Sequence, residues 1–527
     1  MIRTFLRITT IAALLCLLSV VGAAQTDPGV RGGINNTGGG LQSRGIPIPH
    51  TPLISPNPNH PDLVVDDNEL ALFLEGVKRM AQLESTCDKC SVAPFGVGDG
   101  NPVGPPFAPA GTEIDPDFPQ TRTNSNGLGT RHNADSCLVC HAQPTLGGSG
   151  GFIAAHDGDV AQNPSFSLIP HRFGRQNVAP SFEEQFGPIR EVRFKRNPDG
   201  TPDGGVHALY TTTGDISDPF NKGCNAAQEN FAAELAKGNL SFRIPLQLFG
   251  LGLIESIEDT EIMNQHNNTA SARQALGIGG IPNRSGNDGT INRFGWKAQN
   301  KSLAIFAGEA YNVEMGVSND VFPNARDENH NCANNKPAPN DINRIDDNDA
   351  ENHAFNNPLH ELPDWQMFMI TMRFTDAPQP DPRPSASAQA GQRVFNNVGC
   401  TLCHTATMQT GGTSSGTVGG PANSAVLVDR PVSLFSDLLV HHMGPALNDG
   451  ITQGAAGPDQ FRTTPLWGVG QRIFFLHDGR TNDLVQAILL HQSGSGATAS
   501  EANGVIDNFK RLTTTEKQQL VDFLRSL

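Results

Sequence analysis

Two pentapeptides of the form Cys-x-x-Cys-His are the residues whose types and spacing most clearly predict chemistry in this chain. They are Cys137-Leu138-Val139-Cys140-His141 and Cys400-Thr401-Leu402-Cys403-His404. Two thiols separated by two residues can form thioether bonds to the two vinyl groups of one haem, and the imidazole that follows can bind its iron. Zinc binding and a redox disulfide are the alternatives for such a cysteine pair. Two complete motifs favour two covalently bound haem c groups, with His141 and His404 as iron ligands.

The second ligand of each iron decides what such a haem can do. An iron with two strong protein ligands transfers electrons, whereas an iron with an open face can bind peroxide or oxygen. In the C-terminal part of the chain the candidate second ligands are His441, His442, Met443, His477 and His491. Spacing alone does not choose among them.

The N-terminus predicts export. Two arginines precede an apolar run over 8–21, and small residues follow it up to Ala24. This pattern is typical of a secretory signal peptide over 1–24, so we expect a periplasmic protein. No other stretch approaches ~20 apolar residues, so no stable membrane anchor is expected. Lipidation at Cys16 is the alternative.

Length and composition indicate more than one haem-containing core. The chain has 527 residues, of which 37% are hydrophobic, and it contains 56 glycines and 38 prolines. This composition favours a mainly α fold with long loops and a few short strands. The net charge of −16 argues against nucleic acid or an anionic membrane as a partner and suits a small, basic electron-donor protein of the periplasm.

Four cysteines remain after the haem motifs and the signal peptide are set aside: Cys87, Cys90, Cys224 and Cys332. An even number in an oxidising compartment is compatible with two disulfides, whose pairing stays open. Cys87-Asp88-Lys89-Cys90 is followed by Ser91 instead of histidine, so a third haem is not expected there. A redox-active pair is the alternative.

Composition shifts suggest a domain organisation. The segment 25–61 is rich in Gly, Pro and Asn and is expected to be an extended arm. An N-terminal haem domain would follow over 62–375, with an insertion at about 190–290. A proline-rich linker over 376–386 would lead into a C-terminal cytochrome c domain over 387–527.

Hydrophobic periodicity predicts several elements around the motifs. A helix should start near Asn68, with an apolar face of Leu70, Phe73, Leu74, Val77 and Met80. The segments 192–195 and 206–210 are expected to be short strands. A helix over 388–397 should lead into Cys400. A final helix should begin at the capping box Thr513-x-x-Glu516 and bury Leu520, Phe523, Leu524 and Leu527.

Several longer segments resemble a known family. Phe461 to Val469, followed by Phe474 to Arg480, resembles the C-terminal signature of the bacterial di-haem cytochrome c peroxidase superfamily. With the segments 249–255 and 436–439, the chain is similar to the di-haem oxidoreductases, also named thiol oxidoreductases, of this superfamily, which includes MauG-like proteins. The resemblance implies two cytochrome c-like haem domains.

The resemblance also implies a second ligand for the C-terminal iron. In the peroxidases a methionine 14 positions after the histidine of His-Asp-Gly binds that iron. Counting from His477, this chain has His491 at that position. The implied haem is bound by His404 and His491, and such a bis-histidine haem would have a lower reduction potential than a His/Met haem.

For the first haem the resemblance implies a reaction centre. Arg293 to Gln299, followed by Glu314-Met315-Gly316, resembles the segment in which a tryptophan bridges the haems and a glutamate lines the peroxide pocket. Trp296 would then relay electrons, and Glu314 would shuttle a proton between the peroxide oxygens. A core aromatic and a helix-surface acid are the alternatives. His156 is only a loose counterpart of the distal histidine of resting peroxidases.

Asn177-Val178-Ala179-Pro180 resembles a calcium-binding stretch of the peroxidases, but their C-terminal partner residues are not matched. Ca²⁺ is therefore the less favoured cofactor.

Together these features predict a periplasmic di-haem peroxidase-type enzyme of the EC 1.11.1 class. Electrons would pass from the C-terminal haem through Trp296 to the N-terminal haem and reduce peroxide or another small oxidant. One alternative is a non-catalytic electron-transfer protein. Another is oxidation of a protein side chain or an organic molecule, as in MauG and the rubber-cleaving oxygenases.

Overall fold

The computed structural model describes residues 53–62, 64–81, 129–134, 136–141, 143, 147–150, 163, 177–184, 186–211, 226–324, 362–378, 380–381, 383–412 and 424–527. The predicted signal peptide, the start of the predicted arm, the four cysteines considered for disulfides and His156 lie outside these residues.

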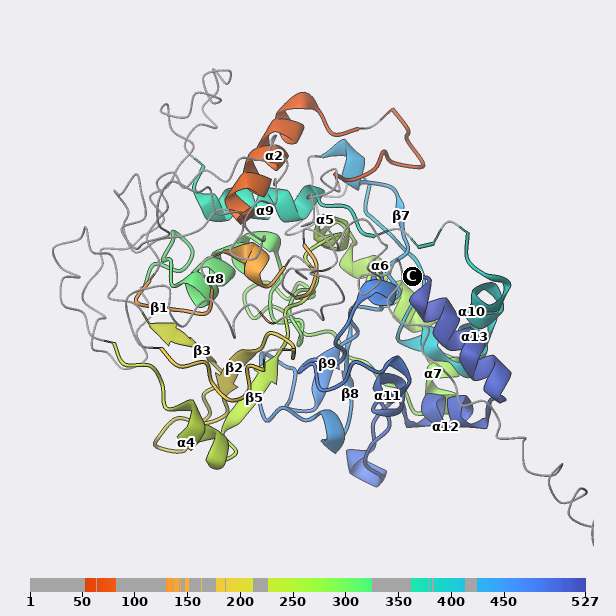
Figure 1. Cartoon of the computed structure of the whole chain (residues 1–527). Coiled ribbons are helices and arrows are strands. Elements are labelled where there is room, and N and C mark those ends of the chain that lie inside the picture. The colour runs from red at the N-terminus through yellow and green to blue at the C-terminus, as the bar shows by residue number, and fades with distance from the viewer. Residues whose placement is uncertain are drawn as a thin grey trace, which may run out of the picture.

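The described N-terminal part is built from helices with a few short strands between them (Figure 1). Its helices are α2 (Asp67–Ala81), η1 (Cys137–Val139), α4 (Phe231–Ala236), α5 (Leu251–Glu255), α6 (Asp259–Asn268), α7 (Ala270–Leu276), α8 (Leu303–Met315) and α9 (Asp364–Phe374). Its strands are β1 (Arg131–His132), β2 (Glu191–Phe194), β3 (Val206–His207), β4 (Tyr210–Thr211) and β5 (Leu240–Arg243).

The C-terminal part is likewise built from helices with a few short strands between them. Its α-helices are α10 (Ala386–Val398), α11 (Leu484–Leu489), α12 (Asn503–Arg511) and α13 (Thr514–Arg525). Its 3₁₀ turns are η5 (Cys400–Leu402), η6 (Ala425–Leu427), η7 (Pro445–Leu447), η8 (Val469–Gln471) and η9 (Gly496–Thr498). Its strands are β6 (Met408–Gln409), β7 (Pro431–Val432), β8 (Val440–His442) and β9 (Gln460–Arg462). The predicted mainly α fold with short strands is confirmed.

All strand pairs are antiparallel and short. β3, β2 and β5 form a three-stranded sheet in that order, with Val192 opposite both His207 and Phe242. Three two-stranded ribbons complete the described strands: β1 with β4, β6 with β7, and β8 with β9. In the last of these, His441 pairs with Phe461, which places it on the ribbon beside the second haem motif.

Two close helix pairs hold the haem motifs, and each depends on a glycine at the contact. α2 packs on α9, where a Cβ on Gly76 would lie 1.8 Å from Thr371 Oγ1. α10 packs on α13, where a Cβ on Gly391 would lie 1.8 Å from the carbonyl oxygen of Gln519. A larger side chain at either position would push the helices apart. In Figure 1, α2 and α9 lie near the top of the molecule, and α10 and α13 lie at its right.

The local predictions around these pairs are confirmed. The helix expected near Asn68 is α2, and Phe73, Val77 and Met80 of its apolar face are buried. The first expected strand segment overlaps β2, and the second overlaps β3 and β4. The helix expected before Cys400 is α10, and α13 carries the predicted capping box at Thr513. All four of its predicted apolar residues are buried: Leu520, Phe523, Leu524 and Leu527.

The buried apolar residues form two main clusters. One consists of residues from α10, α11, α12 and α13 and their surroundings. The larger one spans both sides of the proline-rich segment, from Ile54 and Phe73 to Leu438 and Trp467. The two halves therefore share a core. The domain bounds expected from composition stay a prediction.

The described end of the predicted arm lies against the rest of the molecule. The backbone N–H of Ile54 donates to the carbonyl of Phe374 at 2.8 Å, and the buried amide of Asn57 donates to the carbonyl of Val428 at 2.5 Å. Of the helices in the described residues, none is both long and apolar enough to cross a membrane.

Candidate functional site

Both Cys-x-x-Cys-His motifs adopt the same turn. In each, the first three residues form a 3₁₀ turn, and the histidine N–H donates back to the carbonyl of the first cysteine. This bond is 3.0 Å from His141 to Cys137 and 2.8 Å from His404 to Cys400. The turn holds two thiols and one imidazole close together, as attachment of one haem requires.

The imidazoles of His141, His404 and His491 are each held in one tautomer. In each, Nδ1 lies within hydrogen-bond distance of a backbone carbonyl. The bonds are His141 to Gly148 at 3.1 Å, His404 to Phe435 at 3.0 Å, and His491 to Ala487 at 2.8 Å. A carbonyl oxygen only accepts, so Nδ1 carries the hydrogen. Nε2 then keeps the lone pair that a metal needs.

Enclosure by the protein keeps these imidazoles neutral. Burial lowers the pKa of His141 to about 4 and, together with the neighbouring His491, lowers the pKa of His404 to about 4. Burial also lowers the pKa of His491. At neutral pH all three present a neutral ring, which is the metal-binding form.

The first motif opens into a cavity of about 1160 Å³, a volume that includes space open to solvent. Its wall is mainly apolar but also carries several charged side chains. The wall includes Cys137, Cys140, His141, Glu191, Arg193, Arg243, Trp296, Glu309 and Glu314. A small oxidant could therefore meet proton donors here.

Glu314 lies in this wall, near the C-terminal end of α8. Asn133, next to β1, donates its side-chain amide to Glu314 Oε2 at 2.8 Å, and its backbone N–H donates to the Glu314 carbonyl at 2.7 Å. Arg193 of β2 lies close by. Burial alone would lower the pKa of Arg193, but the carboxylates of Glu191, Glu309 and Glu314 outweigh it and raise that pKa. The structure thus brings Glu314 to the cavity of the first motif.

The second motif opens into a more apolar cavity of about 1480 Å³, again including space open to solvent. His404 and His491 both line it. Met443 and His477 also line it, and burial lowers the pKa of His477 to about 4.

The ring nitrogens of the other two candidate ligands, His441 and His442, already contact other side chains. Both ring nitrogens of His441 contact carboxylates, and the exposed His442 bonds to Asp459 and Gln460. Of the histidines at this cavity, His491 most resembles His404 in its tautomer and burial.

Trp296 is the one described residue that lines both cavities. It is buried, and its indole N–H donates to the Ile244 carbonyl at 2.9 Å. The ring of His477 meets it edge-on, and the Arg472 guanidinium lies 5.9 Å from its ring centre. The aromatic ring therefore forms a partition between the two cavities.

Three buried guanidinium nitrogens in the cavity walls bear on whether haem would fit. Within the described part of the chain, Arg243 Nε on the first cavity has no hydrogen-bond partner. The same holds for Arg462 Nη1 and Arg472 Nη2 on the second. A buried donor without a partner is costly. The two carboxylates of a haem would supply acceptors at these positions, while its ring would fill the apolar space between thiols and imidazole. The residues present therefore fit one haem in each cavity.

Sequence reasoning missed several of these groups. Arg462 lies inside the quoted signature, yet nothing in the pattern showed that its guanidinium faces the cavity. Asp437 and His441 were not connected, because a four-residue spacing brings side chains together on a helix, whereas Asp437 lies in a loop and His441 in β8. Glu501 carried no signal at all.

In the stretch 177–180, which resembles a calcium-binding segment, the Asn177 side chain bonds to the backbone of Thr211. The Asn177 amide oxygen accepts from the backbone N–H of Thr211 at 3.1 Å, and its amide nitrogen donates to the Thr211 carbonyl at 2.9 Å. A calcium ion here stays a prediction.

A sequence model described as "Di-haem oxidoreductase, putative peroxidase" matches residues 189–527, well over half of the chain. The chain belongs to the di-haem oxidoreductase family. Membership implies two haems, and the two cavities with their cysteine and histidine motifs are the places for them.

Similarities to solved structures are weak. The chain is 20% identical to the hydrazine synthase of Kuenenia stuttgartiensis, over 32% of this chain and 56% of that one, with a TM-score of 0.20. It is 19% identical to a MauG-like protein associated with microbial copper homeostasis, over 33% and 55%, with a TM-score of 0.22. It is 13% identical to the diheme peroxidase BthA from Burkholderia thailandensis, over 44% and 65%, with a TM-score of 0.26. The matches thus span between about half and two thirds of those chains. The search of curated proteins gave no match.

Proposed function

We propose that this protein is a di-haem c-type oxidoreductase that reduces peroxide at the first cavity with electrons received at the second. The observation that supports this best is the difference in ligand supply. The second cavity holds two neutral imidazoles with Nε2 available, His404 and His491. Among the described residues that line the first cavity, His141 is the only histidine, and carboxylates stand in its wall.

A haem with an open face would supply a binding site for peroxide and the electrons that cleave its O–O bond. The overall reaction consumes one hydrogen peroxide, two electrons and two protons and yields two waters. Glu314 would take a proton from one peroxide oxygen and deliver it to the other, so that the departing oxygen leaves as water. Asn133, which donates to Glu314 Oε2, would hold that carboxylate in place.

Trp296 would carry electrons between the cavities. It borders both, and its indole N–H is fixed by a backbone carbonyl, so its ring has a defined orientation. Electrons would enter at the haem of His404, cross Trp296 and arrive at the haem of His141.

We place this reaction in the periplasm, because residues 1–24 have the pattern of a secretory signal. The electron donor would be a small periplasmic redox protein. A basic one would complement the net charge of −16.

A second function is favoured by one observation. Met315, which is buried, lines the first cavity together with Tyr311. If the sulfur of Met315 bound the first iron, both irons would have two protein ligands, and the protein would be an electron carrier.

The test is to reduce the purified holoprotein by one electron and record its EPR spectrum with and without cyanide. The peroxidase proposal expects a high-spin ferric signal that cyanide converts to low-spin. Two low-spin haems that ignore cyanide in every redox state would overturn it in favour of the electron carrier. Turnover with peroxide and a reduced small cytochrome would then separate peroxide reduction from oxidation of a protein or organic substrate.

A further inference from the structure

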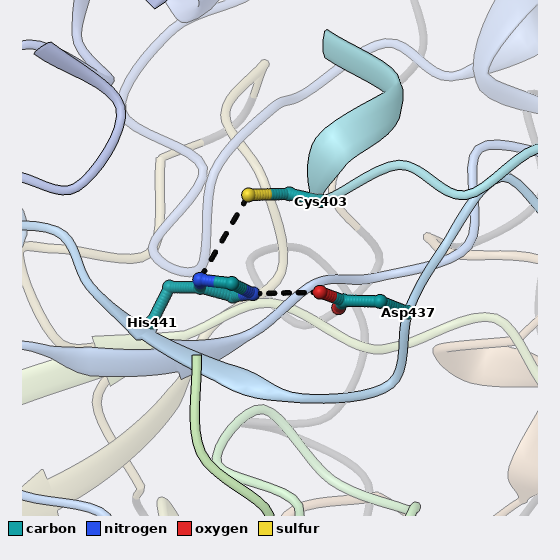
Figure 2. A group of neighbouring side chains, drawn as sticks. All are labelled: Cys403, Asp437 and His441. Carbon is teal, nitrogen blue, oxygen red and sulfur yellow. Dashed lines mark hydrogen bonds and ion pairs between the residues drawn. The ribbon is translucent and has the colours of Figure 1, made fainter. Parts of the chain in front are cut away.

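We propose that a buried cluster of His441, Asp437 and Glu501 acts as a fixed negative charge beside the C-terminal haem and lowers its reduction potential. The inference rests on the haem attachment proposed above for Cys403. Figure 2 shows the core of the cluster, in which the His441 ring lies between the Cys403 sulfur and the Asp437 carboxylate.

The imidazole is held at both nitrogens. His441 Nε2 lies 2.9 Å from Asp437 Oδ2, and His441 Nδ1 lies 2.7 Å from Glu501 Oε2. A carboxylate only accepts, and only the protonated ring can donate from both nitrogens. The contacts therefore describe an imidazolium between two carboxylates, whose total charge is −1.

Each carboxylate is anchored by backbone donors as well. Glu501 Oε2 accepts from the N–H of Gly279 at 3.0 Å, and Glu501 Oε1 accepts from the N–H of His442 at 3.2 Å. Asp437 Oδ1 accepts from the N–H of Leu439 at 3.1 Å. Burial alone would raise the pKa of Glu501, but its bonds with His441 and with these backbone donors outweigh burial and lower that pKa. These bonds also fix the charges in place, so the cluster is already assembled before any electron arrives.

Burial makes this charge effective. The exposed fractions of the side chains are 3% for His441, 5% for Asp437 and 13% for Glu501. Charges interact more strongly where water is excluded, because the effective dielectric constant is low. The ring itself is tightly enclosed, since a Cβ on Gly280 would lie 2.6 Å from His441 Cε1.

The cluster lies at the haem attachment point. His441 Nδ1 is 3.8 Å from the Cys403 sulfur, the atom that would be bonded to the porphyrin. The ferric haem core carries one more positive charge than the ferrous core. A nearby net negative charge therefore stabilises the oxidised form and lowers the potential. A bis-histidine haem also has a low potential, so the cluster would act in the same direction as His491.

The protonation of His441 is consistent with this arrangement. Burial alone would lower its pKa, but the negative charges of Cys403 and Asp437 outweigh burial and raise that pKa well above its usual value. Thioether formation would remove the charge on sulfur and leave the two carboxylates as the partners.

Cys403, Asp437 and His441 could also be considered as metal ligands, since their ligand atoms lie within 4.8 Å of one another. That use is disfavoured because both ring nitrogens already donate to carboxylates, and because the sulfur is committed to the haem.

The test uses the holoprotein and two variants that remove one charge with little change in shape, Asp437→Asn and Glu501→Gln. Midpoint potentials of both haems are measured by spectroelectrochemical titration. Each variant should raise the ferrous-to-ferric ratio of the C-terminal haem at a fixed potential by about tenfold, which corresponds to about 59 mV for a one-electron couple. The midpoint potential of the N-terminal haem should not change.

The chain offers a matched control on the same strand. His442 of β8 is exposed and pairs with Asp459 at 3.1 Å. Asp459→Asn therefore removes a carboxylate next to the neighbouring histidine, but one whose side chain is 24% exposed and pairs with an exposed imidazole. The proposal would be overturned if Asp437→Asn and Glu501→Gln shifted the midpoint potential of the C-terminal haem no more than Asp459→Asn does. Glu501, the more exposed carboxylate, provides the result if Asp437→Asn does not fold.

Failure of the proposed function would be seen separately. A pyridine haemochrome assay counts attached haems, and fewer than two per chain would remove the basis of both proposals. Two attached haems with an unreactive first iron would end the peroxidase proposal, while a shifted potential would still support the charge cluster.

Discussion

The walls of the two cavities differ in the groups they offer to a haem. Around the first, carboxylates and guanidiniums such as Glu191, Arg193 and Glu314 stand near His141, the only histidine among the described residues of that wall. Around the second, His404 and His491 face a mainly apolar space.

Under the proposed function, this difference would give two similar turns different tasks. The turns themselves are nearly alike, and each histidine donates through Nδ1 to a backbone carbonyl. The distinction arises from residues contributed by other segments. α8 delivers Glu314 to the first cavity, and the end of α11 delivers His491 to the second. Proton-transfer groups favour chemistry on a ligand, whereas a second imidazole favours electron transfer.

The largest effect on activity is expected for Glu314→Gln. The amide keeps the shape and the contact with Asn133 but cannot shuttle a proton, so peroxide turnover should fall by at least ~10²-fold. Both haems should stay attached. Stopped-flow turnover with peroxide and a reduced donor measures the effect, and Asp320→Asn, an exposed acid beyond α8, is the control. Turnover that stays at the wild-type rate would mean that Glu314 has no role in proton transfer.

The next largest effect is expected on stability, from the buried ion pairs of Asp449 that connect the N-terminal and C-terminal parts of the chain. Asp449 is fully buried and pairs with Arg243 at 2.8 Å and Lys297 at 3.1 Å. Asp449→Asn would remove the ion-pair partner of two buried cations and should cost about 3–5 kcal/mol of unfolding free energy. Denaturant unfolding, followed separately by haem absorbance and circular dichroism, measures the loss. Asp478→Asn, which disrupts the more exposed pair with Arg480, should cost no more than about 1 kcal/mol.

Whether a feature of this structure could be predicted from the sequence depends on how far apart in the chain its residues lie. The haem motifs, α2, α10 and the cap of α13 were predictable, because each is encoded within a few consecutive residues. The His491 assignment came from resemblance, and its placement in the second cavity is compatible with it.

Interactions between distant segments were not predictable in this way. Arg243, Lys297 and Asp449 form one buried ion cluster, although the first two precede the proline-rich segment and the third follows it. Nothing local distinguishes such a lysine from an exposed one. The same holds for Glu501, which reaches His441 from beyond α11. Only tertiary structure brings these charges together.

The pH dependence of stability should reveal the ionisation of Glu183, a buried residue whose carboxyl group accepts from the backbone N–H of Arg190 in the wall of the first cavity. Burial raises the pKa of Glu183 to about 8, although Asn163 and Arg190 oppose this. The folded state therefore binds a proton between pH ~4.5 and about 8 that the unfolded state has released, so stability falls as pH rises through this range. The slope contributed should be at most about 1.4 kcal/mol per pH unit.

Glu183→Gln tests this assignment, because the variant cannot ionise. Its unfolding free energy, measured with denaturant at several pH values, should fall less steeply from pH 5 to pH 8 than that of the wild type. Glu184→Gln, beside it but exposed, should keep the wild-type slope. Equal slopes in all three proteins would show that Glu183 ionises normally.

A smaller effect is expected from Arg472, whose Nη2 has no partner among the described residues although it faces the second cavity. If a haem carboxylate is its partner, Arg472→Met should lower the unfolding free energy of the holoprotein by about 1–3 kcal/mol. Arg480→Met removes a more exposed guanidinium nearby and should have little effect. A holoprotein that becomes more stable on losing Arg472 would mean that this guanidinium holds no haem carboxylate.

The smallest effect tests whether the two cavities are energetically separate. Thr513 caps α13 by accepting from the N–H of Glu516 at 3.2 Å, while Glu516 bonds back to Thr513. Thr513→Ala should cost about 1 kcal/mol of unfolding free energy. Because Leu520 and Leu524 of the same helix line the second cavity, any loosening should reach that haem first. The potential of the C-terminal haem and the cyanide affinity of the N-terminal haem, measured on one sample, then show whether the disturbance stops at Trp296. A change in cyanide affinity with an unchanged potential would contradict the division of the molecule into two separate sites.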